Sequence, residues 1–281
     1  MKHAIIVLVL VLLVVSFTKL PQLDRVVKAT NSDLECYTLY FFNGIVVYNS
    51  TITETLMLET PGNSTLLDGF TQIVEHVVYY NVEYNESIGA FQFTVRESEF
   101  FEGFFLSRVR VCTKPMSTVL TYLRKALQDP QYGLGAGDVP GEIREQYVRT
   151  PSEIVVDVVV PAYESWFRSR YNIDISEASP LGISVTAAYF IYIEYIKYNA
   201  SALPKTLEEV VNTRTGDCDD MSRVLVELLN YYGIPALMVY GYTVIGGFNM
   251  TIPVENTTYM FVNNGPHAFT ITYIPGFGWM S

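Results

Sequence analysis

The sequence has few charged residues, few basic residues in particular, and only three histidines and three cysteines. Charged residues make up 17% of its 281 residues, and 18 Lys and Arg stand against 29 Asp and Glu. The resulting net charge of −11 repels phosphate backbones, so nucleic acid is excluded as an expected partner. Because 49% of the residues are hydrophobic, the chain must bury a core, which excludes disordered, collagen-like and coiled-coil classes.

No apolar run at the N-terminus reaches the roughly 20 residues that a membrane-spanning helix needs. Lys2 precedes an unbroken apolar block from Ala4 to Val15, which is typical of a secretory signal. Residues 1–18 are therefore predicted to be a signal peptide or a signal-anchor. Cleavage near the small pair Ser16 and Thr18 and retention as an anchor through residues 4–17 both stay open. An ordinary buried helix or strand fits less well, because the block has no periodicity.

Asn-x-Ser/Thr triplets support export of the chain. They predict glycosylation at six positions: Asn49, Asn63, Asn85, Asn199, Asn249 and Asn256. Each triplet alone is weak, because such triplets arise by chance in polar loops. Together with the leader they predict an extracellular or cell-surface glycoprotein, whose contact with a membrane runs only through the N-terminal segment.

The three cysteines divide into a predicted pair and a single thiol. Cys36 and Cys112 lie near the two ends of the first half of the chain, and Cys218 stands alone in the second half. An exported chain usually pairs its cysteines. We therefore expect a Cys36–Cys112 disulfide, with Cys218 left free.

The pattern along the chain predicts an α+β protein with two domains. Residues 19–115 form a β-rich, sandwich-like domain, since short β-branched and aromatic stretches alternate with turn signals such as Asn43-Gly44 and Pro61-Gly62. Residues 116–143 comprise a helix, Met116–Gln128, and a Gly-rich linker. The linker has neither a preceding strand nor a following Lys-Ser/Thr, which disfavours a phosphate-binding loop.

Helices are expected to lead into the last part of the chain. They cover Pro151 to Arg170, a second stretch from Ser184 to Asn199 with Ser184 as its N-cap, and a short helix opened by a capping box at Thr206–Glu209.

Cys218 lies in the first turn of a predicted amphipathic helix. The core-facing positions recur at helical spacing, and Gly233 and Pro235 end the helix; the positions are Met221, Val224, Leu225, Leu228, Leu229 and Tyr232. The thiol shares the inward face. Gly216 just before it is expected to allow a tight turn into the helix.

This position suits a nucleophilic thiol, because the helix N-terminus stabilises a thiolate. Such a thiolate needs an imidazole partner. His3 lies in the leader and His76 in the stranded domain, which leaves His267. His267 is expected to head a strand and to share a face with Phe269, Ile271 and Tyr273. From these residues alone, a small buried cysteine and a loop-edge histidine explain the pair about as well as a catalytic site does.

The same residues resemble the transglutaminase-like superfamily of papain-related cysteine enzymes, particularly its microbial and archaeal members. The matching residues occur in the family's order: Gly216, Cys218, Asp220 and Ser222; Gly233 to Ala236; His267 to Phe269; and Pro275 to Trp279. The resemblance covers roughly residues 144–281. It implies an α+β domain with a Cys-His-Asp triad in which Cys218 is the nucleophile and His267 the general base and acid.

The third member of that triad has no counterpart in this sequence. In the family the orienting Asp lies four positions after the Trp that matches Trp279, which falls two residues beyond Ser281. The domain is therefore expected to be C-terminally truncated, without its last strand. Asp219 and Asp220 are poor substitutes. They are expected to stabilise the helix N-terminus, with Asp220 facing away from the core.

The resemblance predicts an exported cysteine enzyme that acts on amide bonds of proteins or peptides at the cell surface. A thioester on Cys218 would be resolved by water or by an amine, and the motif residues do not decide between hydrolysis and transfer. The alternative is a catalytically silent surface glycoprotein that binds or scaffolds. No cofactor is expected, and metal binding through Cys218, Asp220 and His267 is disfavoured, because the chain lacks a Cys/His cluster.

Overall fold

The computed structural model describes residues 34–48, 50, 53–66, 70–133, 137–201, 205–254 and 257–280. The predicted leader and the acceptors Asn49 and Asn256 lie outside these ranges. The described chain forms two compact units. The first contains residues up to 66, 70–113 and 243–265, and the second contains 114–242 and 266–280. The first is β-rich and the second mixes helices with strands, so the predicted α+β class is confirmed.

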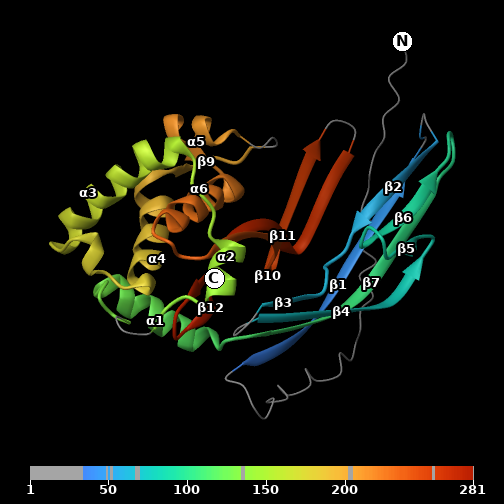
Figure 1. Ribbon diagram of the computed structural model, residues 1–281. Coiled ribbons are helices and arrows are strands. Elements are labelled where there is room, and N and C mark those ends of the chain that lie inside the picture. Colours follow the sequence, from blue (N-terminus) through green and yellow to red (C-terminus); the bar gives the residue numbers. More distant parts are fainter. Residues whose placement is uncertain are drawn as a thin grey trace. The chain divides into compact units, whose positions relative to one another are not determined.

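Two antiparallel sheets form most of the first unit (Figure 1). One has the strand order β1-β7-β4-β3, with β1 at Glu35–Val47, β7 at Phe101–Thr113, β4 at Phe70–Tyr80 and β3 at Ser64–Leu66. The other has the order β2-β6-β5, with β2 at Glu54–Glu59, β6 at Ala90–Val95 and β5 at Glu83–Asn85.

Aromatic side chains join the two sheets into a sandwich. Phe91 on β6 stacks on Phe105 on β7, with ring centroids 4.2 Å apart and planes at 17°. Both rings are fully buried, and aliphatic residues such as Ile45 and Val95 complete the cluster. The structure contains two separate sheets that share this core, which agrees with the predicted sandwich-like arrangement.

Cys36 and Cys112 face each other across β1 and β7 and form a disulfide. His76 on β4 has a structural role in the same unit. Its Nδ1 lies 2.8 Å from the Ser107 hydroxyl, its ring packs on Tyr84 and Phe91, and burial lowers its pKa.

The second unit is built mainly from helices. They are α1 (Met116–Gln128), α2 (Gly141–Tyr147), a π-helical turn Val155–Val159 that continues as α3 (Val160–Tyr171), a 3₁₀ turn Ile175–Glu177, α4 (Pro180–Tyr189) continuing into a π-helical turn Phe190–Tyr195, α5 (Leu207–Thr213) and α6 (Cys218–Tyr231). The short strands β8 (Lys197–Tyr198) and β9 (Thr215–Gly216) pair in parallel. The strands β10 (Ala236–Val254), β11 (Thr257–Ile274) and β12 (Gly278–Met280) form a sheet in that order, and residues 243–265 of β10 and β11 are counted with the first unit.

One predicted helix cap is confirmed by the structure, and another is wrong. The capping box of α5 at Thr206 and Glu209 is confirmed. The prediction of Ser184 as an N-cap is wrong: α4 begins at Pro180, and the Ser179 hydroxyl accepts a hydrogen bond from the Gly182 N–H at 2.8 Å. Proline is well suited to the first helical position, because its missing N–H has no intrahelical partner there.

The buried face of α6 is the centre of the second unit's core. Met221, Val224, Leu225, Leu228 and Leu229 are all buried there, which confirms the predicted amphipathic helix. Helices α4 and α5 pack against α6, as Figure 1 shows. The first residue of α6 is therefore held by one of the best-packed elements of the unit.

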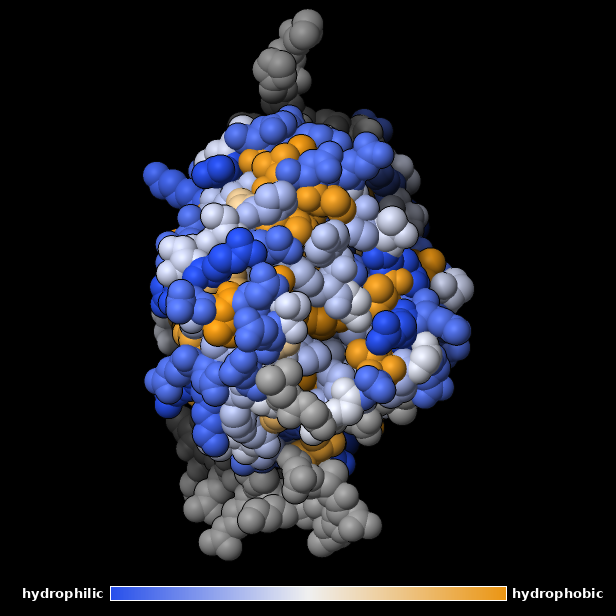
Figure 2. Space-filling view, turned by 60° about the vertical axis from the view of Figure 1, so that its left-hand side comes forward, coloured by the Kyte–Doolittle hydropathy of each residue, from blue (hydrophilic) through white to orange (hydrophobic). Residues whose placement is uncertain are grey.

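The surface carries apolar residues in small groups. On the face drawn in Figure 2 these groups are separated by polar side chains, which is usual for a globular protein. Among the described helices, none combines the length and the apolar character needed to cross a membrane.

Substitution of Gly182 in α4 tests the close packing of this unit. A Cβ atom at this position would lie 1.9 Å from the Pro130 carbonyl oxygen, a backbone atom. We expect Gly182→Ala to lower the free energy of unfolding by about 1–3 kcal/mol, in the range of overpacked cores. Urea unfolding followed by circular dichroism measures the change.

The matched control is Gly141→Ala at the start of α2, where a Cβ atom meets nothing within 4 Å. Its free energy of unfolding should stay within about 0.5 kcal/mol of the parent, as for most open surface positions. Equal losses in the two variants would contradict the packing described for α4.

Candidate active site

The segment that leads into α6 is fixed by a short parallel strand pair. The Lys197 N–H donates to the Arg214 carbonyl and the Asn199 N–H to the Gly216 carbonyl, each at 2.8 Å. Arg214, with φ of 51°, ends α5 in the left-handed region and turns the chain into β9. The chain then enters α6 at Asp217, its N-cap residue.

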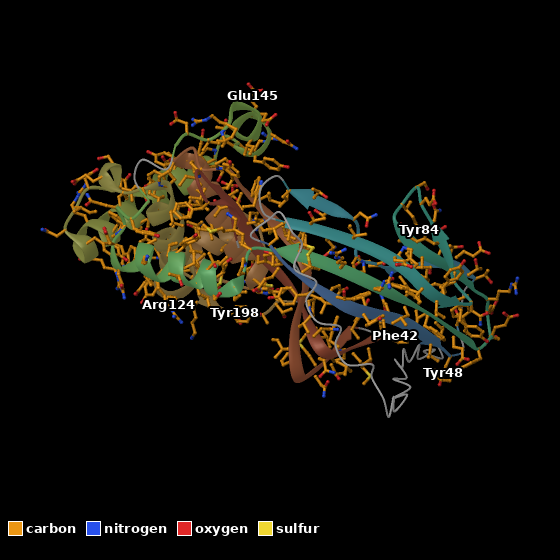
Figure 3. The ribbon with its side chains drawn as sticks, turned by 90° about the horizontal axis from the view of Figure 1, so that it is seen from below. Phe42, Tyr48, Tyr84, Arg124, Glu145 and Tyr198 are labelled. Carbon is orange, nitrogen blue, oxygen red and sulfur yellow. A yellow bond between two sulfur atoms is a disulfide. The ribbon has the colours of Figure 1, made fainter. Side chains whose placement is uncertain are left out.

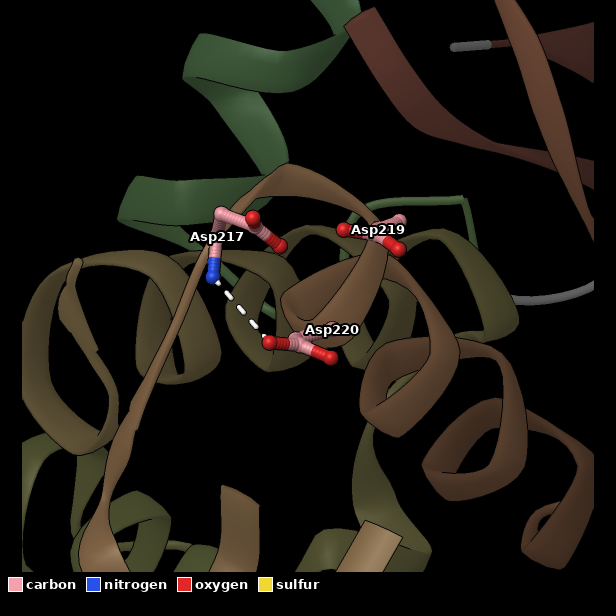
Figure 4. Close-up of side chains that lie close together, drawn as sticks. All are labelled: Asp217, Asp219 and Asp220. Carbon is pink, nitrogen blue, oxygen red and sulfur yellow. Dashed lines mark hydrogen bonds between the residues drawn. The ribbon is translucent and has the colours of Figure 1, made fainter. Parts of the chain in front are cut away.

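Gly216 is required by a close contact and not by its backbone angles. A Cβ atom there would lie 2.7 Å from the Asp220 Cβ. Asp220 is only 1% exposed, so the prediction that it faces away from the core is wrong. The missing Gly216 side chain leaves room for it. The Asp220 carboxylate accepts a hydrogen bond from the Asp217 N–H at 3.4 Å (Figure 4) and lies 3.4 Å from an Arg223 guanidinium nitrogen.

Cys218 is the first residue of α6, and its thiol is free and half-buried. The backbone N–H of Ala268 on β11 donates to Cys218 Sγ at 3.5 Å. Ala268 directly follows His267 in the chain, so this bond brings the backbone next to the predicted base to the predicted nucleophile.

Hydroxyl groups fix α6 to β11 behind the thiol. The Ser222 hydroxyl donates to the Ala268 carbonyl at 3.3 Å, and the Thr270 hydroxyl donates to the Ser222 carbonyl at 3.3 Å. The Tyr192 hydroxyl lies 2.9 Å from the Ser222 hydroxyl. Burial raises the pKa of Tyr192 above its ordinary value, with a smaller contribution from the charge of Cys218.

Tyr192 and Thr270 were missed by the sequence reasoning. Tyr192 is one of 21 tyrosines and lies in a helical stretch whose pattern only indicates burial. Ser222 matched a family position, but its contact with Ala268, 46 residues away, has no local signal in the sequence.

His267 lies inside β11 and does not head it, contrary to the prediction. β11 begins at Thr257 and runs through Pro266. β12 pairs with β11 only from Thr272 to Ile274. Pro266 lies outside this stretch, so its missing N–H removes no hydrogen bond between β11 and β12. The half-buried His267 ring lies nearly parallel to the Phe269 ring, with centroids 6.2 Å apart, as expected for one face of a strand.

No carboxylate is hydrogen-bonded to the His267 imidazole within the described part of the chain. β12 pairs antiparallel with β11, with Tyr273 opposite Trp279 and Thr272 opposite Met280. The strand that was expected to be missing is therefore present over three residues, and it runs along β11 in the direction of His267.

Three aspartates surround the start of α6, as Figure 4 shows. The hydrogen bond with Asp217 raises the pKa of Asp219 to about 6, helped by burial and by the charges of Asp217 and Asp220. Burial opposes ionisation of Asp217, but hydrogen bonds from Asp219 and from the Ser201 and Asp220 N–H groups lower its pKa overall. Of the two, Asp217 therefore ionises at the lower pH, and Asp219 keeps its proton to a higher pH.

The sequence disfavours a metal site through Cys218, Asp220 and His267. The group in the described chain that brings three candidate ligand atoms within 4.8 Å consists of Asp217, Asp219 and Asp220. Asp220 in that group is already bonded to Arg223 and to the Asp217 N–H.

The described glycosylation acceptors differ in their surroundings. Asn63, Asn199 and Asn249 are exposed. Asn85 is half-buried, and its side-chain nitrogen donates to Gln92 at 2.9 Å, so the atom that would carry a glycan is already engaged. Glycosylation at all six positions stays a prediction.

Among curated proteins, the uncharacterized protein YebA of Bacillus subtilis (strain 168) is 34% identical over 84 residues. That match covers 28% of this chain but only 11% of YebA, so the chain spans a small part of this relative.

Among solved structures, this chain is similar to a cysteine protease candidate from Cytophaga hutchinsonii. The TM-score is 0.41 at 17% identity, and the match covers 86% of this chain and 77% of that chain. The periplasmic domain of TgpA from Pseudomonas aeruginosa gives a TM-score of 0.34 at 13% identity, over 86% of this chain and 68% of that one.

The family comparison agrees with the residues described above. The family model of the transglutaminase-like superfamily matches residues 170–281, a range that contains Cys218, Ser222 and His267. This range also contains α6, β11 and β12, the elements that assemble the site. Residues 170–281 are thus similar to the transglutaminase-like superfamily.

Proposed function

We propose that this protein is a cysteine enzyme that acts on amide bonds of proteins or peptides, with Cys218 as the nucleophile and His267 as the general base and acid. The observation that carries the proposal is the hydrogen bond from the Ala268 N–H to Cys218 Sγ. It joins the start of α6 to the residue that follows the only histidine of the second unit. The match of residues 170–281 to the transglutaminase-like superfamily supports the same chemistry.

The reaction follows from these groups. His267 takes the thiol proton, and Cys218 Sγ attacks the amide carbonyl carbon while the carbonyl π electrons move to oxygen. When the carbonyl reforms, the C–N bond breaks and the amine leaves with the proton from His267. A thioester remains on Cys218. Water or a second amine then attacks it, which releases the acid or a new amide and returns the thiol.

The surroundings of the thiol suit a nucleophile. Cys218 is at the N-terminus of a 14-residue helix, where unpaired N–H groups and the helix dipole stabilise negative charge. The Ala268 N–H adds a direct donor to sulfur. Asp217 and Asp219 place negative charge nearby, and the hydrogen bond between them raises the pKa of Asp219 to about 6, so this charge is reduced only below that pH.

We also propose that the enzyme works outside the cytoplasm, at the cell surface or beyond it. The support is the leader-like pattern of residues 1–18, the six glycosylation triplets and the Cys36–Cys112 disulfide. Protein or peptide substrates at that location fit the amide chemistry of the site.

Alkylation of Cys218 by iodoacetamide tests the nucleophile. Because Cys36 and Cys112 are bridged, Cys218 is the single free thiol of the chain. At pH 6.5 we expect the protein to react at least about 10-fold faster than a short cysteine peptide, since a thiol with a general base as its partner is the stronger nucleophile. Cys218→Ala should abolish labelling, and His267→Ala should bring the rate down to that of the peptide. Mass spectrometry after timed quenching measures it.

His76→Gln is the matched histidine control, because His76 packs in the β-rich unit. Its labelling rate should equal that of the parent protein. If the parent protein labels at the peptide rate, or if His267→Ala leaves a fast rate unchanged, the catalytic proposal is wrong and the silent surface glycoprotein is favoured.

Ser222→Ala tests the bond between α6 and β11. The substitution leaves the buried Ala268 carbonyl without the Ser222 donor, which should lower the free energy of unfolding by about 1–3 kcal/mol. Because the Ala268 N–H holds the thiol, the alkylation rate should fall as well. Ser184→Ala is the control, since the Ser184 hydroxyl bonds only within α4, to Pro180. A stability loss without any loss of alkylation rate would show that the bond does not position the site.

Asp219→Asn tests the aspartate pair by its pH dependence. The pKa of Asp219 is raised in the folded state to about 6, so its contribution to stability is complete below the unfolded value and is lost as pH rises through about 6. Asparagine imitates the protonated acid at every pH. The melting temperature of the variant should therefore gain on that of the parent between pH 4 and pH 7. A difference that does not change with pH would refute the pairing of Asp219 with Asp217.

A further inference from the structure

Exposed aromatic side chains are frequent on the strands of the first unit. Phe42 on β1 is 40% exposed and Tyr84 on β5 is 39% exposed (Figure 3). Two more exposed tyrosines, Tyr79 and Tyr80, end β4 and line an open groove of about 800 Å³. The residues that line this groove all belong to the first unit. Its volume is in the range of about 300–1,000 Å³ that is common for ligand sites.

A row of polar side chains also lines the groove. Gln92 and Thr94 on β6 and Arg96 directly after it alternate along the chain, so they project to the same face of the sheet. We call these three residues the polar row. Thr55 on β2 is the register partner of Thr94, and their hydroxyl oxygens lie 3.2 Å apart. The Asn85 side-chain nitrogen donates to the Gln92 side-chain oxygen at 2.9 Å, which leaves the Gln92 amide nitrogen to donate to a ligand.

Packed aromatic rings and a fixed amide complete the lining. Phe93 is 5% exposed and stacks on Phe101, with ring centroids 4.8 Å apart and planes at 16°. The Asn81 side-chain nitrogen donates to the Glu102 carbonyl at 3.0 Å, which orients this amide and leaves its oxygen to accept a hydrogen bond. The groove therefore combines rigid apolar surface with a few placed polar groups, as ligand sites usually do.

Charge and strand pairing restrict the class of ligand. Among the lining residues, Arg96 stands against Glu83 and Glu99, so an anionic ligand is disfavoured. β6 pairs with β2 on one side and with β5 on the other, so an extended peptide gains no strand-edge hydrogen bonds from it. The hydroxyl, amide and charged groups of the lining disfavour a purely apolar ligand. These restrictions favour a neutral ligand that is rich in hydroxyl groups.

We propose that this groove binds a neutral glycan chain through the polar row and the two tyrosines that end β4. Sugar hydroxyl groups both donate and accept hydrogen bonds, so they match the mixed donors and acceptors of the lining. Sugar C–H groups carry partial positive charge and pack on the negative faces of aromatic rings, which Tyr79 and Tyr80 provide. The inference goes beyond the proposed function, because it concerns the first unit and needs no reaction at Cys218.

Isothermal titration calorimetry of the full chain tests the class of ligand. The probes are neutral hexasaccharides of glucose, mannose, xylose and N-acetylglucosamine, each titrated to millimolar concentration. A hexasaccharide of galacturonic acid tests the preference against negative charge, and an uncharged peptide of alternating Ser and Gly tests the preference against a peptide backbone. We expect at least one neutral hexasaccharide to bind, and the acidic hexasaccharide and the peptide to give no binding heat.

Variants of the lining test the location of the site. Tyr79→Ala removes ring surface and should raise the Kd of the bound hexasaccharide at least about 10-fold. Thr94→Val removes a hydroxyl group but keeps the shape and the β-propensity of the side chain, and should raise the Kd about 3–10-fold. The matched control is Tyr40→Ala, a tyrosine on β1 that is 65% exposed and does not line the groove; its Kd should equal that of the parent. Melting temperatures show whether each variant folds.

Three results would overturn the inference. The first is that none of the neutral hexasaccharides binds. The second is that the peptide or the acidic hexasaccharide binds as tightly as the best neutral one. The third is that a hexasaccharide binds but Thr94→Val and Tyr79→Ala leave its Kd unchanged, because the sugar then occupies another surface. None of these results bears on the alkylation of Cys218, so the proposed function is tested separately.

Discussion

The candidate site depends on the contact between the start of α6 and β11. Both backbone groups of Ala268 are hydrogen-bonded to α6: its N–H donates to Cys218 Sγ, and its carbonyl accepts from the Ser222 hydroxyl. Ser222 lies four residues after Cys218, one helical turn along α6, so one face of the helix binds both groups. Because His267 directly precedes Ala268, the bonds that fix this peptide also restrict where the imidazole can lie.

A second constraint concerns the charge at the helix start. Asp217, Asp219 and Asp220 crowd the N-terminus of α6, where carboxylates are normally favourable. Beside sulfur they also add negative charge. Asp220 is buried against Gly216 and paired with Arg223, and the hydrogen bond with Asp217 raises the pKa of Asp219 to about 6. Below that pH the start of α6 carries less negative charge than three ionised groups would give.

Local patterns predict the helix of the site well and its long-range contacts poorly. The amphipathic spacing from Met221 onward fixes the buried face of α6, and the family pattern singles out Cys218 and His267. The position of Asp220 was wrong because helical periodicity cannot register the space left by Gly216. The start of β11 was predicted at His267 but lies at Thr257, because pairing across the sheet decides the length of a strand. Tyr192 has no distinguishing signal among 21 tyrosines.

The sheet restricts where the His267 imidazole can lie. β12 runs antiparallel to β11 from Ile274 back toward Thr272, so its direction leads along the strand to His267. The thiol is held from the helix side, by its own position at the start of α6 and by the Ala268 N–H. The position of the imidazole instead follows the path of β11, on which His267 directly precedes Ala268. Helix and sheet thus place the thiol and the imidazole separately, and the bonds at Ala268 join the two elements.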